Sequence, residues 1–187
     1  MQHLFKYYIL KHKIRFLFEC ILLSKIYPKI HEYIKELIEN INPIELNKKS
    51  LKNKTILSLI MQKFADRVSL QSIQILIDHG ADVNLVSYRE TPLFVLIKNY
   101  DNKHHDSYVN LMKLLIDNGA DINFKFTFYY KHPESALMNF FSSHAYKHWN
   151  FANIMLDFGA TLDVTDLESL PPTSRQRIIE MIENRKG

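Results

Sequence analysis

The sequence is poor in cysteine and glycine, and each shortage excludes a kind of chemistry. Cys20 is the single cysteine among 187 residues, so neither an intramolecular disulfide nor a cysteine-based zinc site can form. This usage is typical of a reducing compartment and predicts a cytoplasmic protein. Glycine occurs four times, which argues against a glycine-rich loop that would cradle a nucleotide phosphate.

Long uninterrupted apolar runs are missing as well. The most apolar stretch near the start, residues 14–27, contains Arg15, Glu19 and Lys25, whereas a transmembrane helix needs about 20 predominantly apolar residues. The same charges argue against a secretory signal peptide. Hydrophobic residues nevertheless make up 47% of the chain, so we expect a folded domain with a sizeable core.

The net charge of +4 is unevenly distributed. Residues 1–54 contain eleven Lys or Arg against five Asp or Glu, a balance of +6, and residues 55–187 contain thirteen against fifteen, a balance of −2. A basic N-terminal part favours an acidic partner or an anionic membrane surface. A solvated helix face gives the same composition, so both interpretations stay open, and no nucleic-acid partner is expected.

The few glycines mark an internal repeat. The segment Ile-Leu-Ile-Asp-His-Gly-Ala-Asp-Val-Asn at residues 75–84 recurs with few changes at residues 114–123 and 154–163. Each apolar run predicts the end of an amphipathic helix. The glycine after it is expected to adopt the left-handed conformation that closes a last helical turn. The three internal glycines share this repeat position: Gly80, Gly119 and Gly159.

Further markers surround each glycine. Asp82 and Asn84 follow the first, and Asp121 and Asn123 follow the second; all are turn-forming residues. Thr91-Pro92 opens the next apolar stretch, and proline is favoured at the first helical position. Each repeat is therefore predicted to contain a short helix, a loop, a second helix and a turn.

Thr91-Pro92-Leu93, followed by residues 114–123, resembles the ankyrin repeat. The resemblance covers residues 51–165, about three repeats, and a degenerate half repeat can be aligned at residues 37–45. It implies an all-α fold: an ankyrin-type helical-repeat solenoid with helical caps at both ends.

One continuous domain is expected, in three parts. A helical N-terminal cap that includes the half repeat would span residues 1–50, the three repeats residues 51–165, and a C-terminal capping helix residues 166–187. Thr173 and Gln176 have the spacing of a capping box at the start of that last helix.

The resemblance also implies a function, namely a non-enzymatic and monomeric adaptor that binds another protein. Partners of such proteins bind the finger-like turns between repeats and the inner helices. The period of 39–40 residues exceeds the family's usual 33 or so. It is similar to that of the long-loop ankyrin proteins of viruses and intracellular bacteria, for which host-cell cytoplasm would be the location.

The turn after Asn123 is unusually aromatic. Aromatic side chains are typical of interface centres, so these residues are either an exposed anchor or fold back over the stack. With the preceding turn they form the candidate partner-binding set: Tyr88, Arg89, Phe124, Phe126, Phe128, Tyr129 and Tyr130. Four lysines of the first turn would extend this basic and aromatic edge: Lys48, Lys49, Lys52 and Lys54.

Residues 1–30 combine basic and aromatic side chains, among them Phe5, Tyr7, Tyr8 and Phe16. One interpretation is a pair of helices that caps the end of the stack. The other is an interfacial helix that anchors a membrane-associated or host-directed effector. The composition leaves both open.

Sequence motifs for catalysis, cofactor binding or metal binding are weak throughout the chain. His144 and His148 would share a helical face, but no third metal ligand accompanies them. Asp82 and Asp121 recur once per repeat, which is typical of turn residues and not of an active site. The sequence therefore predicts no catalytic residue, no cofactor and no metal site.

Overall fold

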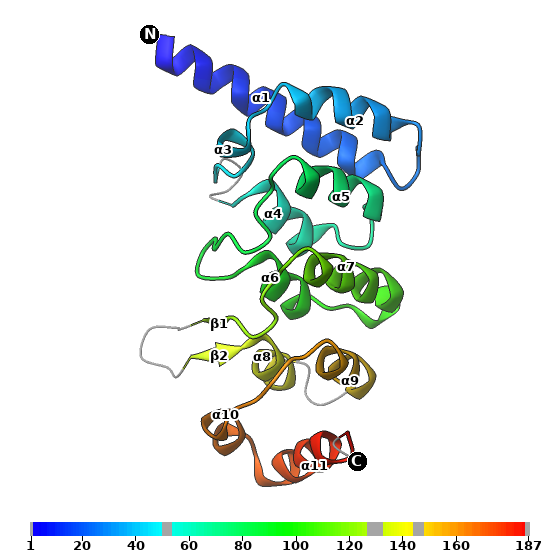
Figure 1. Ribbon diagram of the computed structural model, residues 1–187, viewed down its shortest axis with the longest axis vertical. Coiled ribbons are helices and arrows are strands. Elements are labelled where there is room, and N and C mark those ends of the chain that lie inside the picture. The colour runs from blue at the N-terminus through cyan, green and yellow to red at the C-terminus, as the bar shows by residue number, and fades with distance from the viewer. Residues whose placement is uncertain (1, 50–53, 127–132, 144–147, 186–187) are drawn as a thin grey trace.

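The structure, a computed structural model, is built almost entirely of helices that stack along one long axis (Figure 1). It describes residues 2–49, 54–126, 133–143 and 148–185, and side chains from His12 onward. The N-terminus lies at one end of the stack, and α11 lies at the other. None of the described helices is long and apolar enough to cross a membrane.

The helices come in pairs joined by short loops, and one short hairpin interrupts them. In chain order the elements are α1 (Gln2–Leu23), α2 (Ile30–Glu39), α3 (Pro43–Leu46), α4 (Ile56–Lys63), α5 (Leu70–Asp78), α6 (Pro92–Lys98), the 3-10 helix η1 (Asn102–His104), α7 (His105–Asp117), β1 (Lys125–Phe126), β2 (Glu134–Ser135), α8 (Ala136–Ser143), α9 (Trp149–Asp157), α10 (Val164–Ser169) and α11 (Pro172–Glu183).

Two columns of helices run along the stack. In the inner column α6 packs between α4 and α8, and in the outer column α2, α5, α7 and α9 follow one another. Each pair α4–α5, α6–α7 and α8–α9 thus contributes one helix to each column, and the mostly helical chain is consistent with an all-α ankyrin-like fold. A continuous hydrophobic core extends from Ile14 in α1 to Ile178 in α11.

Each inner helix begins at a hydroxyl side chain in the same repeat position. Thr55, Thr91 and Ser135 accept hydrogen bonds from the backbone N–H three residues later, at 3.1, 3.2 and 3.2 Å. Such a side chain satisfies one of the free N–H groups at a helix start. Pro92 occupies the first turn of α6, where a missing N–H costs nothing. These short helices are apolar because other elements enclose them: Pro92 to Ile97 are all buried.

Consecutive repeats are joined by an asparagine that bonds twice to the next repeat. The Asn84 amide donates to the Gly119 carbonyl at 2.7 Å, and its Oδ1 accepts from the Asp121 backbone N–H at 2.9 Å. Asn123 repeats both bonds one repeat further along, to the carbonyl of Gly159 and the N–H of Thr161. Two parallel bonds fix the spacing between neighbouring turns.

The same bridge reveals where the half repeat was misaligned. The alignment over residues 37–45 places Glu45 opposite Asn84, but Asn47 makes the bridge, to the Gly80 carbonyl at 2.7 Å and from the Asp82 N–H at 2.9 Å. The short helix α3 lies between α2 and this asparagine. It shifts the register by two residues relative to the other repeats.

The turn residues have the conformations that their positions predict. Gly80, Gly119 and Gly159 have φ angles of 88°, 85° and 89°, in the left-handed region that favours glycine. After the first glycine, the Asp82 carboxylate accepts from the Asn84 backbone N–H at 2.8 Å, a local bond that stabilises the turn.

The C-terminal helices differ from the prediction. The capping box expected at Thr173 and Gln176 is wrong, because α11 already begins at Pro172 and has no side-chain cap. A capping box instead starts α10, where Asp163 and Asp166 each accept from the other's backbone N–H. The three-part division stays a prediction, although its boundary at residue 165 falls inside α10.

Candidate functional site

A tight hairpin turn before α6 projects from the same side of the stack as the β1–β2 hairpin (Figure 1). Ser87 and Glu90 exchange backbone hydrogen bonds at 2.9 and 3.1 Å. The two residues between them, Tyr88 and Arg89, have φ angles of 52° and 71°. This is the pattern of a type I′ turn, for which Asn-Gly is preferred. Left-handed conformations cost non-glycine residues about 1–2 kcal/mol each, and such strain tends to occur at functional sites.

The tip of this turn presents its side chains to solvent. Tyr88 is 58% exposed, and Arg89 is exposed beside it. The Lys54 Nζ atom lies 5.6 Å from the centre of the Tyr88 ring, within the range of a cation–π interaction. The first and second turns are therefore in contact at this point, and the continuous basic and aromatic edge stays a prediction.

Lys54, which precedes α4, interacts electrostatically with three other charged residues, and we call the four residues the turn-base cluster: Lys54, Lys63, Lys98 and Glu90. Lys54 is only 8% exposed. Its pKa is lowered, first by burial and then by the charges of Lys98 and Lys63, while Glu90 acts in the opposite direction. Three lysines and one glutamate give the cluster a net charge of +2.

The Glu90 carboxylate already forms an ion pair within the cluster. The Lys98 Nζ lies 2.6 Å from Glu90 Oε1, and the Glu90 backbone is held in the hairpin. Sequence reasoning found Lys54 but missed Lys98 and Glu90. These two stand eight residues apart across a helix start, a separation that matches no local pairing rule.

Phe126 corrects the candidate list, because it is a core residue. It is 2% exposed, and its ring meets that of Phe94 edge-on with centroids 5.1 Å apart. Alternate side chains of a strand point to opposite faces, so Lys125 faces out and Phe126 faces in. Phe124 is half-buried against the same core. At these two positions the aromatics fold back over the stack.

Several other candidates lie outside the described residues. Among the predicted partner-binding residues these are Phe128, Tyr129 and Tyr130, and with them Lys52 of the first turn and His144. The same holds for the side chains of Phe5, Tyr7 and Tyr8. Among the residues that are described, no group of three or more His, Cys, Asp or Glu could hold a metal ion.

Lys125 connects the base of the β1–β2 hairpin to the C-terminal helices through ion pairs. Its Nζ pairs with the Asp163 carboxylate and lies 3.2 Å from Asp166 Oδ2. The bond to Asp163 is the main cause that raises the pKa of Lys125, and the same bond lowers the pKa of Asp163. This lysine is thus compensated by two carboxylates, in contrast to Lys54.

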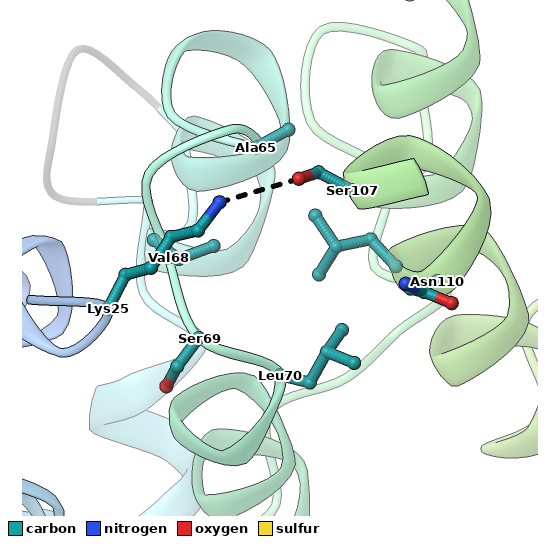
Figure 2. Close-up of a pocket in the computed structure, with 8 residues that line it drawn as sticks. Lys25, Ala65, Val68, Ser69, Leu70, Ser107 and Asn110 are labelled. Carbon is teal, nitrogen blue, oxygen red and sulfur yellow. Dashed lines mark hydrogen bonds between the residues drawn. The ribbon is translucent and has the colours of Figure 1, made fainter. Parts of the chain in front are cut away.

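A pocket of about 220 Å³ lies where the α1–α2 turn, the α4–α5 loop and α7 meet (Figure 2). Lys25 is its one titratable lining residue. Lys25 Nζ donates to the Asp66 carbonyl at 2.7 Å and to Ser107 Oγ at 3.5 Å. Leu70 and Asn110 line the opposite side. Acid–base catalysis needs several converging titratable groups, which this lining does not supply.

Stacked helical pairs, bridging asparagines and projecting turns together define a helical-repeat protein of the ankyrin type. No family model matches the chain. The chain is similar to an ankyrin repeat protein of Acanthamoeba polyphaga mimivirus, with 32% identical residues over 136 aligned positions, which cover 70% of this chain and 76% of that protein. The chain belongs to the ankyrin repeat family, whose members are generally non-enzymatic protein-interaction modules.

Proposed function

We propose that this protein is a monomeric adaptor that binds another protein through its projecting turns and inner helices. In this proposal the chain is an ankyrin-type solenoid, with α1 and α2 covering one end and α10 and α11 the other. The exposed Tyr88–Arg89 tip carries the proposal, because two non-glycine residues are held there in a costly left-handed conformation. The single cysteine, Cys20, is buried, and the lack of cysteine pairs supports a location in the cytoplasm, or in host-cell cytoplasm.

Replacing Tyr88 with alanine is expected to weaken binding of the partner at least about tenfold, because tyrosine at an interface centre contributes well over 1 kcal/mol. Proteins captured on the wild-type chain from the native cell type would be identified by mass spectrometry. The strongest would then be purified, and its affinity for each variant measured by biolayer interferometry.

Tyr27 provides a matched control, because it is 59% exposed against 58% for Tyr88 and lies away from that turn, between α1 and α2. Tyr27→Ala is expected to change the affinity less than about twofold. Loss of affinity in both variants, or in neither, would contradict a partner site at the Tyr88 turn.

A second candidate function, association with an anionic membrane surface, is supported by the first helical pair. Among its residues from His12 onward, five large apolar side chains are exposed: Phe16, Leu23, Ile26, Tyr27 and Tyr33. Exposed cations, Lys13 and Arg15 on α1 and Lys25 and Lys29 after it, surround them. Apolar side chains flanked by basic ones are typical of interfacial helices.

Flotation with phosphatidylserine-containing liposomes tests this second function. If it holds, we expect the wild-type chain to float, and Ile26→Asp with Tyr27→Asp to abolish most of the binding, since two charges would enter the apolar layer. Tyr88→Asp, a change of the same kind at the other surface, should float like the wild type. Absence of flotation by the wild-type chain would remove this candidate.

A further inference from the structure

We propose that the turn-base cluster binds an acidic segment of the partner protein, with a Glu or Asp carboxylate seated between Lys54 and Lys98 beneath the Tyr88 ring. The inference rests on the proposed adaptor function and specifies the chemistry of its partner.

The first reason is that Lys54 lacks a counter-ion. Among the described residues, no carboxylate lies within ion-pair distance of its Nζ atom, and its recorded contact is the Tyr88 ring. Buried charges are ordinarily paired, because removing an ion from water is costly. Burial also lowers the Lys54 pKa, although the charge of Glu90 acts in the opposite direction, so Glu90 compensates this cation only in part. An incoming carboxylate would supply the missing charge.

The second reason is that the cluster's own carboxylate cannot neutralise it. Glu90 lies 2.6 Å from Lys98, so it already forms one close pair. Lys54 and Lys63 add two further positive charges to that pair. A cluster with a net charge of +2 attracts one or two anionic groups.

The third reason concerns the shape of the ligand. Lys54 is 8% exposed, which leaves little of this residue open to a flat membrane surface. A nucleic acid would need a row of exposed cations along several turns, but at the next turn Lys125 is compensated by Asp163 and Asp166. A single side-chain carboxylate is small enough to pair with one ammonium group beside the turn. The exposed Tyr88 ring would then pack against the apolar part of the same segment.

A binding titration with the full chain tests the inference. The probe is a fluorescein-labelled polyglutamate peptide, with polyglutamine of the same length as the neutral control, and the readout is fluorescence anisotropy at low ionic strength. We expect polyglutamate to bind and polyglutamine not to bind. Lys54→Met should weaken polyglutamate binding at least about fivefold, because it removes a charge-assisted contact.

Lys113→Gln is the matched control. Lys113 is an exposed lysine of α7, paired with Asp117 at 2.7 Å, and its loss lowers the net charge of the chain by the same amount. We expect a change of less than about twofold. Because burial disfavours the charged form of Lys54, Lys54→Met should also keep or raise the melting temperature. Weaker binding together with an undiminished melting temperature separates a ligand-binding role from a structural one.

Three outcomes would overturn the inference: equal binding by Lys54→Met and Lys113→Gln, no preference for polyglutamate over polyglutamine, or Lys54-dependent binding to phosphatidylserine vesicles without binding to polyglutamate. The adaptor function is tested separately, by whether binding of the captured partner depends on Tyr88. A partner whose binding depends on Tyr88 but not on Lys54 would support the adaptor function and contradict only the acidic-segment inference.

Discussion

Replacing Phe151 with alanine is expected to lower the free energy of unfolding by about 3–5 kcal/mol. Phe151 lies on α9 and is fully buried. Its ring stacks on Tyr100 with centroids 4.0 Å apart and an interplanar angle of 20°, and it also meets the ring of Phe140 at 5.3 Å. These rings come from two successive repeats, so the alanine variant would leave a cavity at the junction between them. Urea unfolding followed by far-ultraviolet circular dichroism measures the loss.

Phe16→Ala is the control for this prediction. Phe16 is 48% exposed on α1, and among the side chains from His12 onward its ring meets the Tyr33 ring edge-on. Truncating a half-exposed phenylalanine removes little buried area, so we expect a loss below about 1 kcal/mol. Equal losses in the two variants would mean that the Phe151 side chain is not enclosed as the structure has it.

The repeats could be predicted from the sequence because their signals are local. A helix that ends at Gly80 and one that begins at Thr91 are each specified by residues within a few positions. Left-handed glycines, hydroxyl caps and the 3.6-residue apolar period act over one or two helical turns. Such signals recur in every copy, so each copy supports the interpretation of the others.

The role of the bridging asparagines could not be predicted, because it depends on contacts between repeats. Asn84 looks like a turn former, yet its side chain bonds to Gly119 and Asp121, 35 and 37 residues away. The register error at Asn47 has the same origin. The inserted helix α3 changes the number of residues between α2 and the bridging asparagine. The bond from Asn47 to Gly80 nevertheless keeps the distance between neighbouring turns in the folded chain.

The candidate site was only partly predictable for a related reason. The aromatic turn was recognised from composition, but composition cannot distinguish Phe126, which faces the core, from its exposed neighbour Lys125. The turn-base cluster was missed because Lys54 and Lys98 approach each other only when α4 packs against α6. At the C-terminus, the misplaced capping box reflects a start of α11 at Pro172, before Thr173.

Gly80→Ala is the second change with a large expected effect, a loss of about 2–5 kcal/mol in the free energy of unfolding. Gly80 has a φ angle of 88°, which costs a residue with a Cβ atom about 1–2 kcal/mol. A Cβ atom there would also lie 2.9 Å from the Pro43 Cβ, and such overpacking adds about 1–3 kcal/mol. Since the Gly80 carbonyl accepts from Asn47, moving the turn to relieve the clash would strain this bridge as well. Chemical unfolding of the purified variant measures the loss.

Gly119→Ala separates the two contributions, because Gly119 has nearly the same φ angle, 85°, but among the described residues, apart from its chain neighbours, no atom lies within 4 Å of its added Cβ. Its expected loss is the backbone part alone, about 1–2 kcal/mol. The difference between the two variants therefore measures how firmly α3 packs against the first full repeat. A second replacement, Pro43→Ala in the Gly80→Ala background, keeps the Pro43 Cβ atom but frees the chain to move, so it should recover part of that difference. Equal losses at Gly80 and Gly119 would show that α3 yields without cost, and the N-terminal helices would then be a loosely attached unit instead of an extension of the repeat stack.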